Sequence, residues 1–169
     1  MTLLAQVHVR DGKLIADGVE YECRIGRAGV SANKCEGDLT TPIGRFPMRW
    51  CYWRPDKLAE APKTQLPLLE ITPDDGWCDD PQDPLYNQPV VLPFEPSHEK
   101  LFRDDDVYDL VIPLGYNDDP AKPGKGSAIF MHLMRSDGVG TEGCVALKRE
   151  DLLALLPRFS IHTHVVVES

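Results

Sequence analysis

Prolines and glycines interrupt this chain so often that long helices have little room to form. The 169 residues contain 15 prolines and 13 glycines, and such residues end helices or mark turns. The short segments between them suit strands, so we expect a mainly β domain of the β-rich α+β kind. With 42% hydrophobic residues, a chain of this length supports one substantial core but hardly two. We therefore predict a single domain over residues 1–169.

The first strands are indicated by two Asp-Gly pairs, Asp11-Gly12 and Asp17-Gly18, which separate alternating apolar stretches. An Asp-Gly pair in this context is the strongest short-range signal for a β-hairpin. We expect a three-stranded meander over residues 4–26.

The remaining regular elements follow from apolar runs between turn residues. The run at residues 127–133 is almost continuously apolar, which is typical of a strand buried on both faces. A helix is expected over residues 148–156, ended by Pro157. Further strands are expected at residues 46–53, 107–116 and 161–167.

Residues 54–96 contain nine prolines, so we expect a long excursion with little regular structure beyond a strand near residues 68–72. Long loops on small domains are usually functional or mobile.

Charge and hydropathy exclude several classes of partner. The chain has 27 acidic and 18 basic residues and a net charge of -9, which repels phosphate backbones and anionic lipids. We expect neither nucleic acid nor a membrane surface as a partner. No apolar run approaches the roughly 20 residues of a membrane span, and no secretory signal is visible at the start of the chain.

The five cysteines include no C-x-x-C pair, which argues against a disulfide framework and a ribbon-type zinc site. Two imidazoles in His162-Thr163-His164 could form half of a metal site with His8 or His98, although a solvated strand face is the favoured interpretation. We expect no metal and no cofactor. Small, partly buried hydrophobic side chains are expected at Cys23, Cys35, Cys51 and Cys78.

The fifth cysteine, Cys144, has the setting of a nucleophile. A cysteine reacts as its thiolate, so it needs a nearby base and a backbone that presents its sulfur to a cleft. Gly143 permits a sharp turn, and the backbone N–H groups of Gly143 and Cys144 could face an oxyanion. His132 lies twelve positions upstream at the end of a predicted buried strand, and it is the candidate base.

Three segments in order extend this pattern: Thr41-Pro42-x-Gly44-x-Phe46, then Gly126-Ser127-Ala128-Ile129-Phe130-Met131-His132, then Thr141-x-Gly143-Cys144-Val145. Together they resemble the motifs of the L,D-transpeptidase (YkuD-type) family. The resemblance spans about residues 37–147 and implies a β-sandwich or barrel domain with a short helix after the catalytic cysteine.

The resemblance also implies an activity. Cys144 would attack a carbonyl of a peptidoglycan stem peptide and form a thioester, with His132 as general base and acid. Donor and acceptor stem peptides would be the partners, carbapenem β-lactams the inhibitors, and the periplasm or cell envelope the location. A backbone carbonyl, Asp109 or Asp137 would orient the histidine.

Substrate contacts are expected from polar groups near the motifs. Aspartates within residues 75–81 are candidates to hold a diaminopimelate ammonium, and their interpretation as solvated loop acids stays open. The candidate substrate-binding residues are Tyr108, Tyr116, Asn117, Arg135 and Thr141.

Two positions depart from the family pattern. Glu142 stands where the family commonly carries histidine, and Ala146 where it commonly carries arginine. Both favour an alternative, a non-catalytic cell-wall binding module, whereas retention of Cys144 and His132 favours an enzyme. An L,D-carboxypeptidase and another type of cysteine amidase remain further alternatives.

Overall fold

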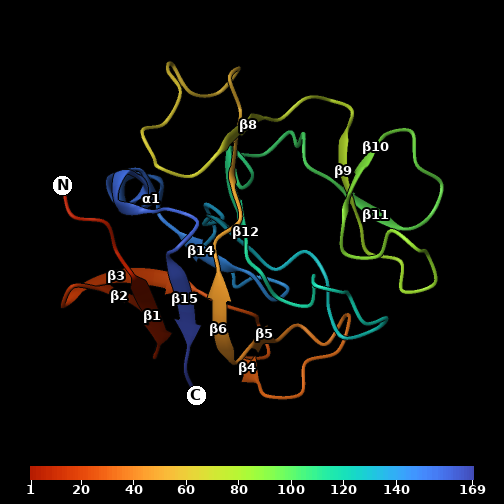
Figure 1. Ribbon diagram of the computed structural model, residues 1–169, viewed down its shortest axis with the longest axis horizontal. Helices are drawn as coiled ribbons and strands as arrows, with labels where there is room; N and C mark the ends of the chain where they lie inside the picture. The colour runs from red at the N-terminus through yellow and green to blue at the C-terminus, as the bar shows by residue number, and fades with distance from the viewer.

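A computed structural model describes residues 1–169. The protein is mainly β, as predicted, and is organised around one ten-stranded sheet (Figure 1). In spatial order the strands are β6 (Gly44–Pro47), β15 (His164–Val167), β1 (Gln6–Arg10), β2 (Lys13–Ala16), β3 (Val19–Arg24), β14 (Val145–Leu147), β13 (Phe130–Leu133), β12 (Leu110–Pro113), β7 (Cys51–Trp53) and β8 (Leu68–Glu70).

The predicted meander is confirmed. Strand β2 pairs antiparallel with both β1 and β3. Asp11 and Gly12 have φ of 51° and 71°, and Asp17 and Gly18 have φ of 47° and 78°. Two consecutive residues with positive φ are what a type I′ hairpin turn requires, so the Asp-Gly pairs set both turns.

The large sheet curls back on itself. Strands β6 and β7 are separated by only three residues in the chain but lie near opposite ends of the strand order. The connecting segment joins these ends: Met48 N–H donates to Thr163 on one side, and Arg49 N–H donates to Pro113 on the other. The apolar faces thus surround one main core, which includes the fully buried Phe159 and Met131.

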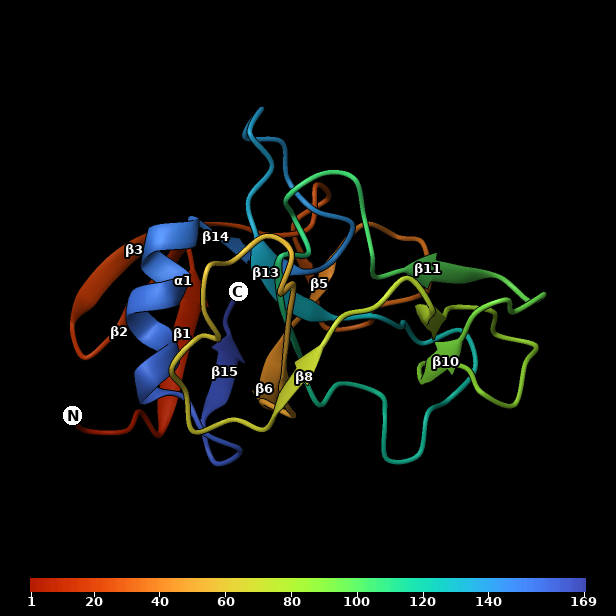
Figure 2. The same ribbon diagram turned by 90° about the horizontal axis from the view of Figure 1, so that it is seen from above.

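The helix forms where it was predicted, as α1 (Arg149–Leu155), and lies beside β1 and β15 (Figure 2). It buries Leu152 and Leu155. Pro157 does not stop the chain from coiling, because it lies early in a 3-10 turn (Leu156–Arg158), where a missing N–H is tolerated. No helix reaches the length and apolar character that crossing a bilayer requires.

The expected strand over residues 46–53 is two strands, β6 and β7, and the other predicted strands are shorter than expected. The expectation for residues 54–96 was partly wrong. Strand β8 forms, but β9 (Asp75–Cys78) and β10 (Pro89–Val91) also form, and with β11 (His98–Lys100) they build a three-stranded sheet in the order β10-β9-β11. Pro89 is tolerated because β10 is an edge strand.

This three-stranded sheet lies at the end of the molecule opposite α1 in both views (Figures 1 and 2). A second apolar cluster of 10 buried residues, which includes Trp77, Phe130 and Cys144, joins it to the large sheet. A last strand pair, β4 (Val30–Ser31) with β5 (Thr41–Pro42), closes the loop of residues 32–40.

Candidate active site

Cys144 immediately precedes β14 and is 7% exposed. Its Sγ accepts a hydrogen bond from Phe130 N–H at 3.3 Å and donates one to Ala128 O at 3.2 Å. Ala128 has a φ of 54°, a left-handed conformation that is uncommon for a residue other than glycine. The start of strand β13 and the residues before it therefore hold the thiol in a defined position.

His132 lies on β13 and is buried. Its Nδ1 lies 2.8 Å from Leu133 O, and because a carbonyl only accepts, Nδ1 carries the proton. In the neutral ring Nε2 is then an acceptor, the state that a general base needs. The group that orients His132 is thus a backbone carbonyl, whereas Asp109 pairs with Arg149 and Asp137 with Arg135.

The two strands bring His132 and Cys144 to one cavity. Strands β13 and β14 are parallel, with His132 opposite Ala146. Cys144 precedes Ala146 by two residues, so both side chains point to the same face of the sheet. The active-site cavity of about 460 Å³ is lined by residues that include Cys144, His132, Tyr108, Thr141, Arg135 and Glu99.

Burial dominates the protonation of both groups. Burial, together with the negative charge of Glu99, raises the pKa of the Cys144 thiol to about 12. Burial lowers the pKa of His132 to about 4, and Arg103 acts in the same direction while the Leu133 hydrogen bond opposes it. At neutral pH the site therefore rests as a neutral thiol and a neutral imidazole rather than as an ion pair.

Thr141 shapes the turn that delivers Cys144. Its Oγ1 donates to Cys144 O at 2.7 Å and accepts from Gly143 N–H at 3.1 Å. The Gly143 N–H is therefore engaged within the turn. The Cys144 N–H has no acceptor within the protein, which leaves it free for a developing oxyanion.

The candidate substrate-binding residues divide into two groups. Tyr108, Arg135 and Thr141 line the active-site cavity. Tyr116 and Asn117 lie outside it, where the Tyr116 hydroxyl donates to Lys125 O and the Asn117 side chain bonds backbone atoms of Lys122 and Gly126. Those contacts stabilise the 116–126 loop.

Tyr108 contacts both His132 and Glu99 in the cavity wall. Its ring lies edge-on to that of His132, with centroids 5.3 Å apart, and its hydroxyl donates to Glu99 at 3.0 Å. Burial raises the pKa of Glu99 to about 7, despite the Tyr108 hydrogen bond. Among the aspartates of residues 75–81, Asp79 lines the same cavity and accepts a hydrogen bond from Ser97.

Glu99 is a cavity residue that the sequence does not reveal. It lies on the short strand β11, in a segment without apolar alternation, and it reaches the cavity only because the three-stranded sheet packs there. No local signal marks such a residue.

The other cysteines are all unpaired. Cys23, Cys51 and Cys78 are buried as expected, but Cys35 is exposed, as are the next two residues of its loop, Glu36 and Gly37. No group of three or more His, Cys, Asp or Glu side chains is placed to hold a metal ion. The imidazole of His8 instead hydrogen-bonds Glu168.

The fold and the site together define a β-rich domain with a buried cysteine and histidine in one cavity. The family model of the YkuD L,D-transpeptidase catalytic domain matches residues 3–167. The chain therefore belongs to the YkuD family of L,D-transpeptidase catalytic domains. No curated protein and no solved structure matches it.

Proposed function

We propose that this protein is a peptidoglycan L,D-transpeptidase that cross-links stem peptides through a thioester on Cys144. The observation that carries the proposal is that the Cys144 thiol and a neutral His132, whose Nε2 is an acceptor, line the same cavity of a YkuD domain. A binding module would need neither group.

The proposed reaction begins when Cys144 Sγ attacks a carbonyl carbon of the donor stem peptide. The thiol proton passes to His132 Nε2, and the carbonyl oxygen becomes an oxyanion near the Cys144 N–H. Collapse of this intermediate breaks the peptide bond, and His132 returns the proton to the leaving amine. An amine of the acceptor stem peptide then attacks the thioester and gives its proton to His132 Nε2. The C–S bond breaks, the amide cross-link forms, and His132 returns the proton to Cys144 Sγ.

Because Cys144 and His132 are both neutral before substrate binds, a proton must move during the first step. Because the thiol has a pKa of about 12 and the imidazole one of about 4, the thiolate is scarce before substrate binds. We therefore expect proton transfer to accompany attack, and the thiol to leave its hydrogen bond to Ala128 O as the substrate enters.

The proposal extends to partners and location. Donor and acceptor stem peptides are the substrates, carbapenem β-lactams would acylate Cys144, and the protein would act in the periplasm or cell envelope. Tyr108, Arg135 and Thr141 are the proposed substrate contacts, since they line the cavity.

The test is mass spectrometry of the products after incubation with purified disaccharide-peptide fragments of peptidoglycan. The wild type should form cross-linked dimers, and Cys144→Ala should form none while keeping its circular dichroism spectrum. Shortened monomers would instead indicate an L,D-carboxypeptidase, and unchanged fragments would favour another amide substrate or a binding module. Dimers formed by Cys144→Ala would contradict the mechanism.

A further inference from the structure

Lys34 is a buried cation close to the active site. Only 3% of its side chain is exposed. Burying an ammonium costs several kcal/mol unless it is paired, and the Nζ has one partner, Asp38 Oδ1, at 2.9 Å. A neutral side chain of similar length at position 34 would not carry this cost of burying a charge.

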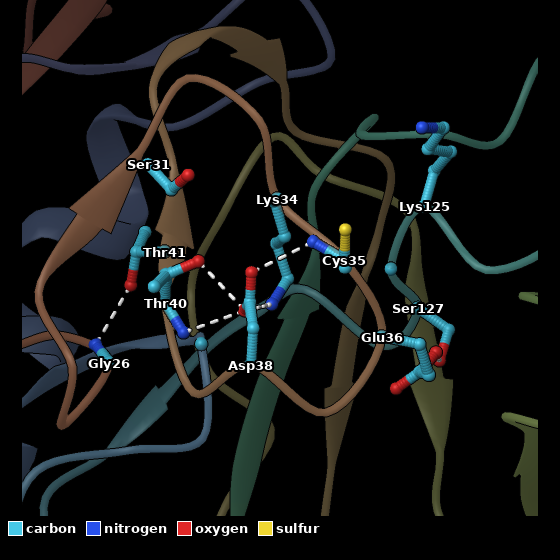
Figure 3. A network of polar contacts seen from close by, with 12 residues as sticks. Gly26, Ser31, Lys34, Cys35, Glu36, Asp38, Thr40, Thr41, Lys125 and Ser127 are labelled. Atoms are coloured by element: carbon cyan, nitrogen blue, oxygen red, sulfur yellow. Dashed lines mark hydrogen bonds and ion pairs between the residues drawn. The ribbon is translucent and has the colours of Figure 1, made fainter.

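Asp38 is fixed in place by the 32–40 loop (Figure 3). Its carboxylate accepts hydrogen bonds from the N–H of Cys35 at 2.8 Å, and from the N–H and hydroxyl of Thr40 at 2.9 and 2.8 Å. Burial opposes the ionisation of Asp38, but these contacts and Lys34 hold its pKa well below its usual range. The pair is therefore ionic and has a defined geometry.

The Lys34 side chain runs between two glycines that make room for it. A Cβ at Gly126 would lie 3.0 Å from Lys34 Cε, and a Cβ at Gly143 would lie 3.3 Å from its Nζ. Both glycines have φ values, 115° and 142°, that other residues rarely adopt. The ammonium is thereby held against the residue that precedes Cys144.

The charges around Cys144 are mostly unfavourable to a thiolate. Glu99 and Glu142 raise the pKa of the thiol, whereas Lys34 and the Phe130 N–H lower it. Tyr108 and His132, which also line the cavity, have pKa values shifted by burial toward their neutral forms. The remaining acids of the lining accept hydrogen bonds, Glu36 from Tyr86 and Ser127 and Asp79 from Ser97. Arg27, Arg103 and Arg135 also line the cavity, but each pairs with an acid, Glu142, Asp105 and Asp137 respectively.

We propose that Lys34 is a positioning residue of the active site, whose buried ammonium, held by Asp38 against Gly143, stabilises negative charge on the Cys144 sulfur. Asp38 sets the strength of this effect, because its own charge partly cancels that of Lys34 at the sulfur. Neither Lys34 nor Asp38 lines the active-site cavity, so the pair acts on the sulfur from outside the cavity lining.

This inference rests on the proposed role of Cys144, but its test does not need turnover. The rate at which iodoacetamide alkylates Cys144 is measured against pH by peptide mass spectrometry, which separates this thiol from the other four. Lys34→Met should slow alkylation at pH 9 by about tenfold, the equivalent of one pKa unit. Asp38→Asn, which keeps an oxygen acceptor, should speed it several-fold.

The double variant Lys34→Met/Asp38→Asn removes both charges and should recover much of the rate lost in Lys34→Met, to within about threefold of the wild type. Lys125→Met removes an exposed lysine near the same loop (Figure 3) and should change the rate by less than about twofold. A purely structural role for the pair predicts that both single variants act in the same direction and that the double variant is worse. That pattern, or an unchanged rate in Lys34→Met, would overturn the proposal.

Discussion

The active-site cavity has two walls of different construction. One wall is the strand pair β13 and β14, in which every residue is buried. His132 lies on β13, and Cys144 immediately precedes β14. The other wall comes from the three-stranded sheet, which contributes Glu99 from β11 and Asp79 after β9. The first wall holds the proposed nucleophile and base, and the second places the carboxyl groups of Glu99 and Asp79 in the same cavity.

The two walls meet at Asn87. Its Oδ1 accepts hydrogen bonds from Trp77 Nε1 and from Ala128 N–H, both at 3.0 Å. Ala128 is in turn the residue whose carbonyl accepts from Cys144 Sγ. The buried side chain of Asn87 thus connects the segment of residues 54–96 to Cys144. Changes in this segment can therefore affect Cys144, although the segment supplies no reacting group.

The proposed reacting groups and the carboxyl groups beside them thus come from separate parts of this fold. Variants of the strand pair should change whether the reaction occurs, and variants of the three-stranded sheet should change stability or the acidity of Cys144. The predictions below test this division.

The largest effect is expected from His132→Gln. Glutamine is neutral and of similar size, but it cannot take the thiol proton. Loss of a general base typically costs about 10²–10⁴-fold in rate, so we expect cross-link formation to fall within this range. A matched exposed variant, His162→Gln, should retain the wild-type rate. A loss of less than tenfold in His132→Gln would remove His132 from the mechanism.

His132 should also make the folded protein sensitive to acid. Its pKa is lowered from 6.5 to about 4 in the folded state, so between these values the unfolded chain binds the proton and the folded protein does not. Stability is therefore complete above pH 6.5 and is lost as the pH falls toward 4, by at most about 3 kcal/mol.

Denaturant unfolding of wild type and His132→Gln at pH 7 and pH 5 measures this effect. Glu99, whose pKa is raised, acts in the opposite sense as the pH falls, but it is present in both proteins and cancels in their difference. An equal loss of stability in both proteins would show that His132 is not buried in its neutral form.

Asn87→Gly tests the connection between the walls. Asn87 has a φ of 60°, so glycine removes the side chain without straining the backbone. The variant leaves Trp77 Nε1 and Ala128 N–H without an acceptor, at a cost of roughly 2–3 kcal/mol in the free energy of unfolding. The exposed Asn33→Gly should lose much less, and equal losses would contradict a special role for Asn87.

Glu99→Gln should give the smallest effect. Removing this negative charge lowers the pKa of Cys144, so alkylation of Cys144 at pH 9 should rise by about three- to tenfold. At pH 5.5, where Glu99 itself is largely protonated, the difference should disappear. The control is Glu95→Gln, which changes an exposed acid four residues before Glu99. An equal change in both variants would show that Glu99 has no special effect on Cys144.

Strand β13 and the meander were predictable from local signals. The three-stranded sheet was not, although the aspartates of residues 75–81, which include Asp79, were named as candidates. The Asp-Gly pairs required positive φ, and the continuous apolar run before His132 required a buried strand, so both features were predictable from a few neighbouring residues. Strands β9 and β10 pair across intervening loops in a proline-rich segment, where no alternation reveals them. Lys34 likewise has no local signal, since its environment is created by Gly126 and Gly143 from distant parts of the chain.

Cys144 is the proposed acyl acceptor, and every step of the proposed reaction passes through its sulfur. The decisive measurement is intact-mass and peptide-map spectrometry after incubation with a carbapenem, at equal concentrations of wild type, His132→Gln and Cys144→Ala. We expect one adduct per wild-type chain, mapped to Cys144, slower formation in His132→Gln and none in Cys144→Ala. An adduct on another cysteine, or one that persists in Cys144→Ala, would contradict the assignment of the nucleophile.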